Sequence, residues 1–229
     1  MPSATEAPLQ MVACQIAARG VTDQRVLDAM RSVPREAFVP VDLRARAYED
    51  GSLGIGAGQT ISQPYVVALM IEQARIRPGD RVLEVGAGSG YAAAVLGRIA
   101  GRVFAIERHE ILATAAAERL ARLGCDNVEV HAGDGTEGLP DQAPFDAIIV
   151  SAAGPGIPDT LTRQLVIGGR LIIPVGARHQ QRLLRVTRIS ENVTDEEDLG
   201  AVAFVPLIGA HGWSKADAPP TRGFTSEPT

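Results

Sequence analysis

Short apolar runs alternate with longer segments of helical spacing between residues 81 and 175. The run 82–85 lacks the polar alternation of a half-exposed strand, which indicates a strand buried on both faces. The expected strands are 82–85, 101–106, 127–131, 145–150 and 170–175. The segments between them predict helices at 91–99, 109–123 and 161–166. This alternation is typical of a doubly wound α/β fold, in which a mostly parallel sheet carries helices on both faces.

The N-terminal part has a different pattern. Residues 7–32 predict two short helices, the second of them capped by Thr22. The glycine-rich, polar stretch 51–63 predicts a loop. A helix is then expected from Pro64 to about Ile76, because proline is favoured at the first position of a helix. We therefore expect a small helical extension before the alternating region.

The C-terminal part predicts an antiparallel end to the sheet. Two segments, 181–189 and 200–207, look like strands around an acidic turn at 191–198, which predicts a final β-hairpin. At 229 residues the chain is long enough for one large domain with a substantial core. We expect a single domain over 1–229, divided into N-terminal helices and a loop (1–80), a ligand-binding core (81–213) and a flexible tail (214–229).

The sequence RVLEVGAGSGY at 81–91 joins the first strand of the core to its first helix. Gly86, Gly88 and Gly90 let the backbone approach a ligand closely, because glycine has no Cβ. A dinucleotide-binding turn needs a small sixth residue, whereas Tyr91 stands there. No lysine follows the glycines, which excludes a phosphate-binding P-loop. The pattern G-x-G-x-G is instead common in methyltransferases that use S-adenosylmethionine, a nucleoside without phosphate.

Acidic residues follow the next two strands. Glu107 lies about 20 residues after the glycines, where a carboxylate suits the hydroxyls of a ribose. Asp134, between Gly133 and Gly135, suits the amine of an adenine. Each residue alone has a simpler explanation, as a strand-end charge or as part of an ordinary turn. Because ligands of open α/β sheets bind at the carboxyl ends of strands, the succession of these features favours a nucleoside-bearing ligand.

Charge and composition limit the partners. The net charge is -5 and no basic cluster is present, which argues against nucleic acid as the main substrate. No apolar run reaches about 18 residues and no signal-peptide pattern is present, so we expect a cytoplasmic protein without a membrane partner. The two cysteines and four histidines show no metal-ligand spacing, so we expect no bound metal.

A second motif, GQTISQP at 58–64, directly precedes a predicted helix. Residue type alone explains Ser62 equally well as the N-cap of that helix. The chain nevertheless resembles the protein-L-isoaspartate O-methyltransferases, which are class I enzymes dependent on S-adenosylmethionine. The matching stretches cover nearly the whole chain in order: VPREAFVP (33–40), AYEDGSLGIGAGQTISQP (47–64), LEVGAGSGY (83–91), GDG (133–135), DAIIVSAA (146–153), GGRLIIPVG (168–176) and VPL (205–207).

The resemblance implies a Rossmann-like methyltransferase fold and a specific reaction. A methyl group would pass from S-adenosylmethionine to the α-carboxylate of L-isoaspartyl residues in damaged proteins and peptides, with S-adenosyl-L-homocysteine as the product. The methyl ester would then start repair through a succinimide. We expect a monomer in which Ser62 is the active-site serine. The implied cofactor contacts are Gln59, Thr60, Ile61, Ser62, Glu84, Gly86, Gly88, Glu107, Asp134 and Gly135.

Two other functions fit the same motifs. One is a carboxylate methyltransferase for a dedicated natural-product peptide; the short tail after Trp213 disfavours it, because we would expect an added recognition segment. The other is a catalytically silent module that binds S-adenosylmethionine, which the intact serine motif disfavours. The chain departs from the family pattern at Ala87, Ala92 and Ile208, where that pattern has Thr, Gln and often a polar residue.

Overall fold

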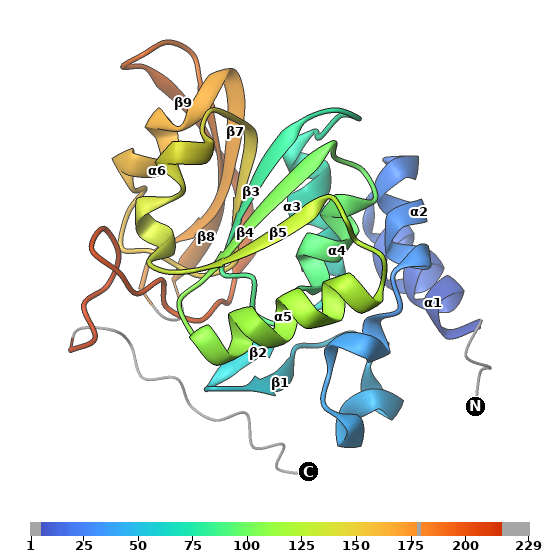
Figure 1. Cartoon of the computed structure of the whole chain (residues 1–229). Coiled ribbons are helices and arrows are strands. Elements are labelled where there is room, and N and C mark those ends of the chain that lie inside the picture. Colours follow the sequence, from blue (N-terminus) through green and yellow to red (C-terminus); the bar gives the residue numbers. More distant parts are fainter. Residues whose placement is uncertain (1–5, 178–179, 217–229) are drawn as a thin grey trace.

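The computed structural model describes residues 6–177 and 180–216 and centres on a seven-stranded sheet (Figure 1). Its strand order is β5-β4-β3-β6-β7-β8-β9, with β3 to β7 parallel and β8 and β9 antiparallel. The order reverses between β3 and β6, the point where open α/β sheets bind ligands. The strands are Arg81–Val85 (β3), Arg102–Glu107 (β4), Val128–Ala132 (β5), Phe145–Val150 (β6), Leu165–Val175 (β7), Gln181–Arg188 (β8) and Thr194–Val202 (β9). The predicted fold class is confirmed.

Helices cover both faces of this sheet (Figure 1). The N-terminal helices, α3 and α4 pack on one face, and α6 packs on the other. The α-helices are Glu6–Gln10 (α1), Gln24–Ser32 (α2), Pro64–Ala74 (α3), Tyr91–Gly97 (α4), Glu110–Arg122 (α5) and Asp159–Arg163 (α6). Shorter turns are the π-helix η1 (Met11–Ile16) and the 3-10 turns η2 (Ala17–Arg19), η3 (Arg35–Phe38), η4 (Val41–Arg46), η5 (Gly135–Glu137) and η6 (Pro140–Gln142).

Each face of the sheet has its own buried cluster. In β3, Val82 belongs to the cluster that contains Met30 of α2 and Ile71 of α3, whereas its neighbour Leu83 belongs to the cluster that contains Leu161 of α6. Successive side chains of a strand point to opposite faces, so both must be apolar when both faces are covered. This is why the core strands appear as continuous apolar runs, and why their positions were predictable.

The stretch expected to be a loop is a β-hairpin. β1 (Leu53–Gly56) pairs antiparallel with β2 (Gln59–Ile61), and this two-stranded sheet is separate from the main one. Leu53 stands opposite Ile61 and both side chains are buried, so the hairpin closes against the core. The loop prediction was wrong because glycine is normally depleted in strands and masks their alternation.

The C-terminal hairpin is present with different bounds. β9 begins at Thr194, so most of the acidic residues assigned to a turn lie in the strand. Arg182 Nε donates to Asp198 Oδ2 at 2.8 Å, and Arg185 pairs in the same way with Glu197. These cross-strand ion pairs offset the low strand propensity of the acidic residues, which the sequence pattern could not anticipate.

Two further boundaries differ from the predictions. The N-cap of α2 is Asp23 rather than Thr22, because the Asp23 carboxylate accepts from the backbone N–H of Arg25 at 2.9 Å. The helix expected at 161–166 ends at Arg163, since Leu165 already pairs with β6. The expected tail from residue 214 falls largely outside the described residues.

Candidate active site

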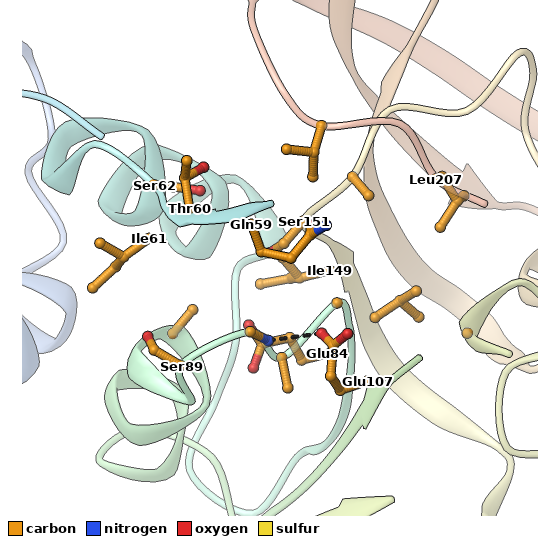
Figure 2. Close-up of a pocket in the computed structure, with 18 of the residues that line it drawn as sticks. Gln59, Thr60, Ile61, Ser62, Glu84, Ser89, Glu107, Ile149, Ser151 and Leu207 are labelled. Atoms are coloured by element: carbon orange, nitrogen blue, oxygen red, sulfur yellow. Dashed lines mark hydrogen bonds between the residues drawn. The ribbon is translucent and has the colours of Figure 1, made fainter. Parts of the chain in front are cut away.

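A cavity lies at the carboxyl ends of β3, β4 and β6, beside the β1–β2 hairpin (Figure 2). The hairpin side contributes Gln59 to Ser62, and the strand ends contribute Glu84 and Glu107 on the opposite side (Figure 2). Every residue predicted to bind the cofactor lines this cavity except Asp134: Gln59, Thr60, Ile61, Ser62, Glu84, Gly86, Gly88, Glu107 and Gly135. The fold therefore brings together two motifs that are separate in the sequence.

The glycine turn is fixed beside the cavity by a hydrogen bond to Glu107. One Glu107 oxygen accepts from the backbone N–H of Gly88 at 2.9 Å (Figure 2), and the other accepts from that of His109 at 2.9 Å. Gly86 and Gly88 have φ of 88° and 53°, values that favour glycine. A Cβ on Gly88 would come within 3.2 Å of Ile55 Cδ1 on the hairpin. The turn and the hairpin are therefore in direct contact at the cavity.

Glu84 leaves one carboxylate oxygen unpaired at the floor of this cavity, although its carboxyl group accepts a backbone hydrogen bond from Ala93. Its side chain is 1% exposed, and among the described residues nothing donates to Oε2. Burial raises the pKa of Glu84 well above its usual range, and the nearby charge of Glu107 raises it further. Such a group is best satisfied by a ligand that donates hydrogen bonds or carries positive charge. The amine and sulfonium of S-adenosylmethionine meet that requirement, so the cavity fits this cofactor.

Ser62 lies between β2 and α3 and is not a helix cap. The N-cap of α3 is Gln63, which makes no side-chain cap bond, and Pro64 is the first helical residue. The backbone of Ser62 is anchored instead, since its carbonyl accepts from Arg35 Nη2 at 2.7 Å. The explanation of Ser62 as a helix N-cap is therefore excluded. Its side chain lies at the cavity wall with that of Thr60 (Figure 2).

Asp134 is engaged away from the cavity. Its carboxylate accepts from Thr136 N at 2.9 Å, from Thr136 Oγ1 at 2.7 Å and from Ala210 N at 2.7 Å. Burial alone would raise the pKa of Asp134, but these hydrogen bonds outweigh it and lower the pKa. Asp134 therefore fastens the segment after β9 to the sheet. Leu207 and Ile208 of that segment line the cavity.

Sequence reasoning missed several residues of the cavity wall. Ser151 and Ala152 follow β6, and the rule that ligands bind at strand ends would have identified them. Val205 to Ile208 come from the segment after β9; the resemblance marked VPL at 205–207 and the departure at Ile208, but did not place them in the cavity wall. Ile208 gives this wall an apolar side chain at the position where the family pattern often has a polar one.

Comparison with known families gives one consistent match. The model of the family "Protein-L-isoaspartate(D-aspartate) O-methyltransferase (PCMT)" matches residues 8–212. A protein-L-isoaspartate O-methyltransferase of Rhodopseudomonas palustris is 58% identical over 208 residues, which cover 90% of this chain and 95% of that protein. One of Roseiflexus castenholzii is 59% identical over 201 residues, covering 88% and 92% of the two chains.

Solved structures agree with these relatives. A protein-L-isoaspartate O-methyltransferase superposes with a TM-score of 0.80 at 29% identity and covers 91% of this chain and 67% of its own. A second, from Plasmodium falciparum, has a TM-score of 0.76 at 25% identity, covers 91% and 99% of the two chains, and was solved in complex with S-adenosyl-L-homocysteine. The fold is therefore that of an S-adenosylmethionine-dependent methyltransferase. The cavity lies at the strand ends, where open α/β sheets bind their ligands.

The described residues hold neither a membrane-spanning helix nor a cluster of metal ligands. None of the helices there is both long and apolar enough to cross a membrane. Within the same residues, no three or more His, Cys, Asp or Glu side chains are grouped so that they could hold a metal ion.

Proposed function

Because the chain belongs to the protein-L-isoaspartate(D-aspartate) O-methyltransferase family, we propose that its Ser62 loop holds the α-carboxylate of an L-isoaspartyl residue beside the methyl donor. The enzyme methylates isoaspartyl residues of damaged proteins with S-adenosylmethionine. The observation that supports the role of the loop is the contact between the hairpin and the glycine turn, which places Ser62 and Glu84 on the same cavity.

The residues of the site suit a reaction that needs alignment more than proton transfer. A carboxylate is already ionised at pH 7, so it can attack a methyl group without a general base. When bound, S-adenosylmethionine supplies an electrophilic methyl on a positively charged sulfur. The chain then has to orient the acceptor and exclude water. Thr60 and Ser62 offer hydroxyl donors for the acceptor carboxylate, and the hairpin beside the glycine turn limits access of water.

The residues proposed to hold the cofactor divide by chemistry. Gly86, Gly88 and Gly135 offer backbone surface without side chains, and Gly135 has no room for one because a Cβ would lie 2.5 Å from Val85 Cγ1. Glu84 offers its unpartnered oxygen to a cationic group, and Glu107 is proposed to meet ribose hydroxyls at the end of β4. Gln59, Thr60 and Ile61 close the cavity from the hairpin; Asp134 is proposed to act indirectly, through the segment that it fastens.

The proposed acceptor is tested with a matched pair of peptides. Purified full-length protein, supplied with methyl-labelled S-adenosylmethionine, should label an L-isoaspartyl peptide and not the same peptide with normal aspartate. The label should leave as methanol in mild base, because the product is an ester. Equal labelling of both peptides would contradict specificity for isoaspartate and favour a side-chain carboxylate methyltransferase. Cofactor binding in calorimetry without labelling of either peptide would favour a silent module.

We further propose that the chain acts as a single-domain monomer in the cytoplasm, without a nucleic-acid or membrane partner. Buried side chains from Met11 near the N-terminus to Leu183 in β8 belong to one cluster, which supports a single domain. The net charge of -5 disfavours binding to phosphate backbones. Light scattering should give the mass of one chain, and a dimer mass would contradict the monomer.

A further inference from the structure

The backbone of the serine loop is held from inside the protein by a buried arginine. Arg35 lies in η3, far from Ser62 in the sequence, and is 0% exposed to solvent. Its Nη2 donates to the Ser62 carbonyl at 2.7 Å, and its Nε donates to the Ala47 carbonyl at 2.7 Å. A single rigid guanidinium thus joins the chain before the hairpin to the chain after it.

This arginine has no acidic partner among the described residues. Glu36, its neighbour in the sequence, instead accepts a hydrogen bond from the Tyr48 hydroxyl. The Arg35 guanidinium lies 4.7 Å from the centre of the Tyr91 ring, and Tyr91 itself lines the cavity. Its Nη1 is buried and donates to no group in the part of the chain that the structure describes.

Such an arrangement is costly for folding alone. Burying a cation without a carboxylate loses hydration that two carbonyl contacts and one ring replace only in part. Burial accordingly lowers the pKa of Arg35. An apolar side chain of similar length could fill the space without that cost. Arg35 lies directly behind the serine loop and hydrogen-bonds to it, so the unfavourable burial is best explained by a role in holding that loop.

We propose that Arg35 is a positioning residue for methyl transfer, fixing the Ser62 backbone so that the loop presents its hydroxyls to the substrate carboxylate. This inference rests on the proposed function. A displacement of about 1 Å at a reacting group lowers rates strongly, so one fixed carbonyl matters for the whole loop. The uncompensated positive charge of Arg35 also favours an anion at Ser62, because opposite charges attract strongly in a low-dielectric interior.

The test compares Arg35→Lys with a matched control, Arg170→Lys. Arg170 also donates from Nε to a backbone carbonyl, that of Ala74 at 2.8 Å, but at the far end of α3 from Ser62. Lysine loses the planar fork at both positions, and at the fully buried position 35 burial also lowers its pKa and disfavours its charged form. Thermal unfolding of both full-length variants shows how much stability each one loses, so that effects on turnover can be compared at similar stability.

Two readouts are expected to separate the variants. Amide hydrogen exchange over residues 59–63 should speed up roughly tenfold in Arg35→Lys and stay unchanged in Arg170→Lys. With the isoaspartyl peptide, kcat of Arg35→Lys should fall at least about tenfold, a larger change than that in KM for peptide, because the loop is no longer held in place. Arg35→Met, which removes the charge, should in addition raise KM for peptide. Calorimetric affinity for S-adenosylmethionine should change little in all three variants.

An unchanged rate of amide hydrogen exchange over 59–63 in Arg35→Lys would overturn the proposal. An equal loss of kcat in the control variant Arg170→Lys would also overturn it. If Arg35→Lys does not fold, the exchange comparison is made with Arg35→Met, with the same criterion. Hydrogen exchange needs no substrate. A wild-type protein that fails to methylate the peptide would therefore refute the proposed function, while the exchange data would still decide the role of Arg35.

Discussion

In the proposed role, Ser62 acts as a hydroxyl donor on a fixed backbone at the cavity wall rather than as a nucleophile. No histidine is placed against it among the hydrogen bonds of the described residues, and its loop is held by Arg35. The nucleophile of the reaction is the substrate carboxylate, which is ionised without help at neutral pH. A serine in this role contributes by hydrogen bonding to the acceptor, and its removal should affect turnover more than cofactor binding.

Substituting Ser62 tests this directly. Ser62→Ala should lower kcat for the isoaspartyl peptide by roughly 10–100-fold, the range expected when a hydrogen bond to a charged group of about 1.5–3 kcal/mol is lost. Affinity for S-adenosylmethionine, measured by calorimetry, should stay within about threefold. The melting temperature is expected to stay at the wild-type value, since Ser62 is not the cap of α3. Unchanged turnover would leave Ser62 without a role in the reaction.

Glu84 combines a cost to folding with a proposed role in cofactor binding. Its pKa is raised in the folded protein, so its contribution to stability is present at low pH and is lost as the pH rises through the folded pKa. Glu84→Gln should therefore raise the melting temperature of the ligand-free protein at pH 8 and change it little near pH 4. The same substitution should weaken binding of S-adenosylmethionine about tenfold, or ~1.4 kcal/mol. Melting curves at the two pH values and calorimetry check both effects; a lower melting temperature at pH 8 would contradict the first.

At the scale of elements, the sheet was predictable and the hairpin was not. Strand β6 has the bounds expected from its apolar run, and β3 and β4 differ by a residue or so. Most residues of these strands are buried, because both faces are covered, and this produces a nearly continuous apolar run. β1 and β2 depend on pairing with each other and on contact between Ile55 and the glycine turn. In a glycine-rich segment, such pairing leaves no alternation of apolar and polar residues from which a strand could be predicted.

The contact between the hairpin and the glycine turn should be measurable. Gly88→Ala should weaken binding of S-adenosylmethionine at least about tenfold and destabilise the protein by about 1–2 kcal/mol, because a Cβ at φ of 53° is strained and presses on Ile55. Gly124→Ala is the matched control, since Gly124 has φ of 66° and open space around it. The control should lose similar stability in urea unfolding and keep its affinity. Equal losses of affinity would show that the effect is not local.

At the scale of the whole molecule, the N-terminal helices and the sheet form one cluster around the site. Tyr91, which lines the cavity, packs edge-on against Phe38 at a centroid distance of 5.5 Å and donates to Met30 Sδ at 3.7 Å. Near the C-terminal end of the described chain, Trp213 is fixed to the segment after β6, since its Nε1 donates to the carbonyl of Ala153 at 3.0 Å. The segments far apart in the sequence are thus tied to the same core.

This arrangement predicts one cooperative unfolding transition. Far-UV circular dichroism, which averages over all elements, and the fluorescence of Trp213, the only tryptophan of the chain, should give coincident urea curves. Met30→Ala should shift both curves together by about 2–5 kcal/mol, because Met30 is fully buried. Two separated transitions, or a shift in circular dichroism alone, would mean that the N-terminal helices unfold independently and would contradict a single domain.

The sequence alone determined the core strands, the glycine turn and the carboxylates at strand ends, and the resemblance added the serine loop. These features are local: a buried strand or a positive φ constrains the residues that form it. Tertiary structure decided the rest. It formed the hairpin, directed the Asp134 carboxylate to Ala210 and set Arg35 behind Ser62. Each of these contacts joins residues whose own sequence neighbourhoods give no sign of the partner, because a long-range contact is selected by the packing of the whole chain.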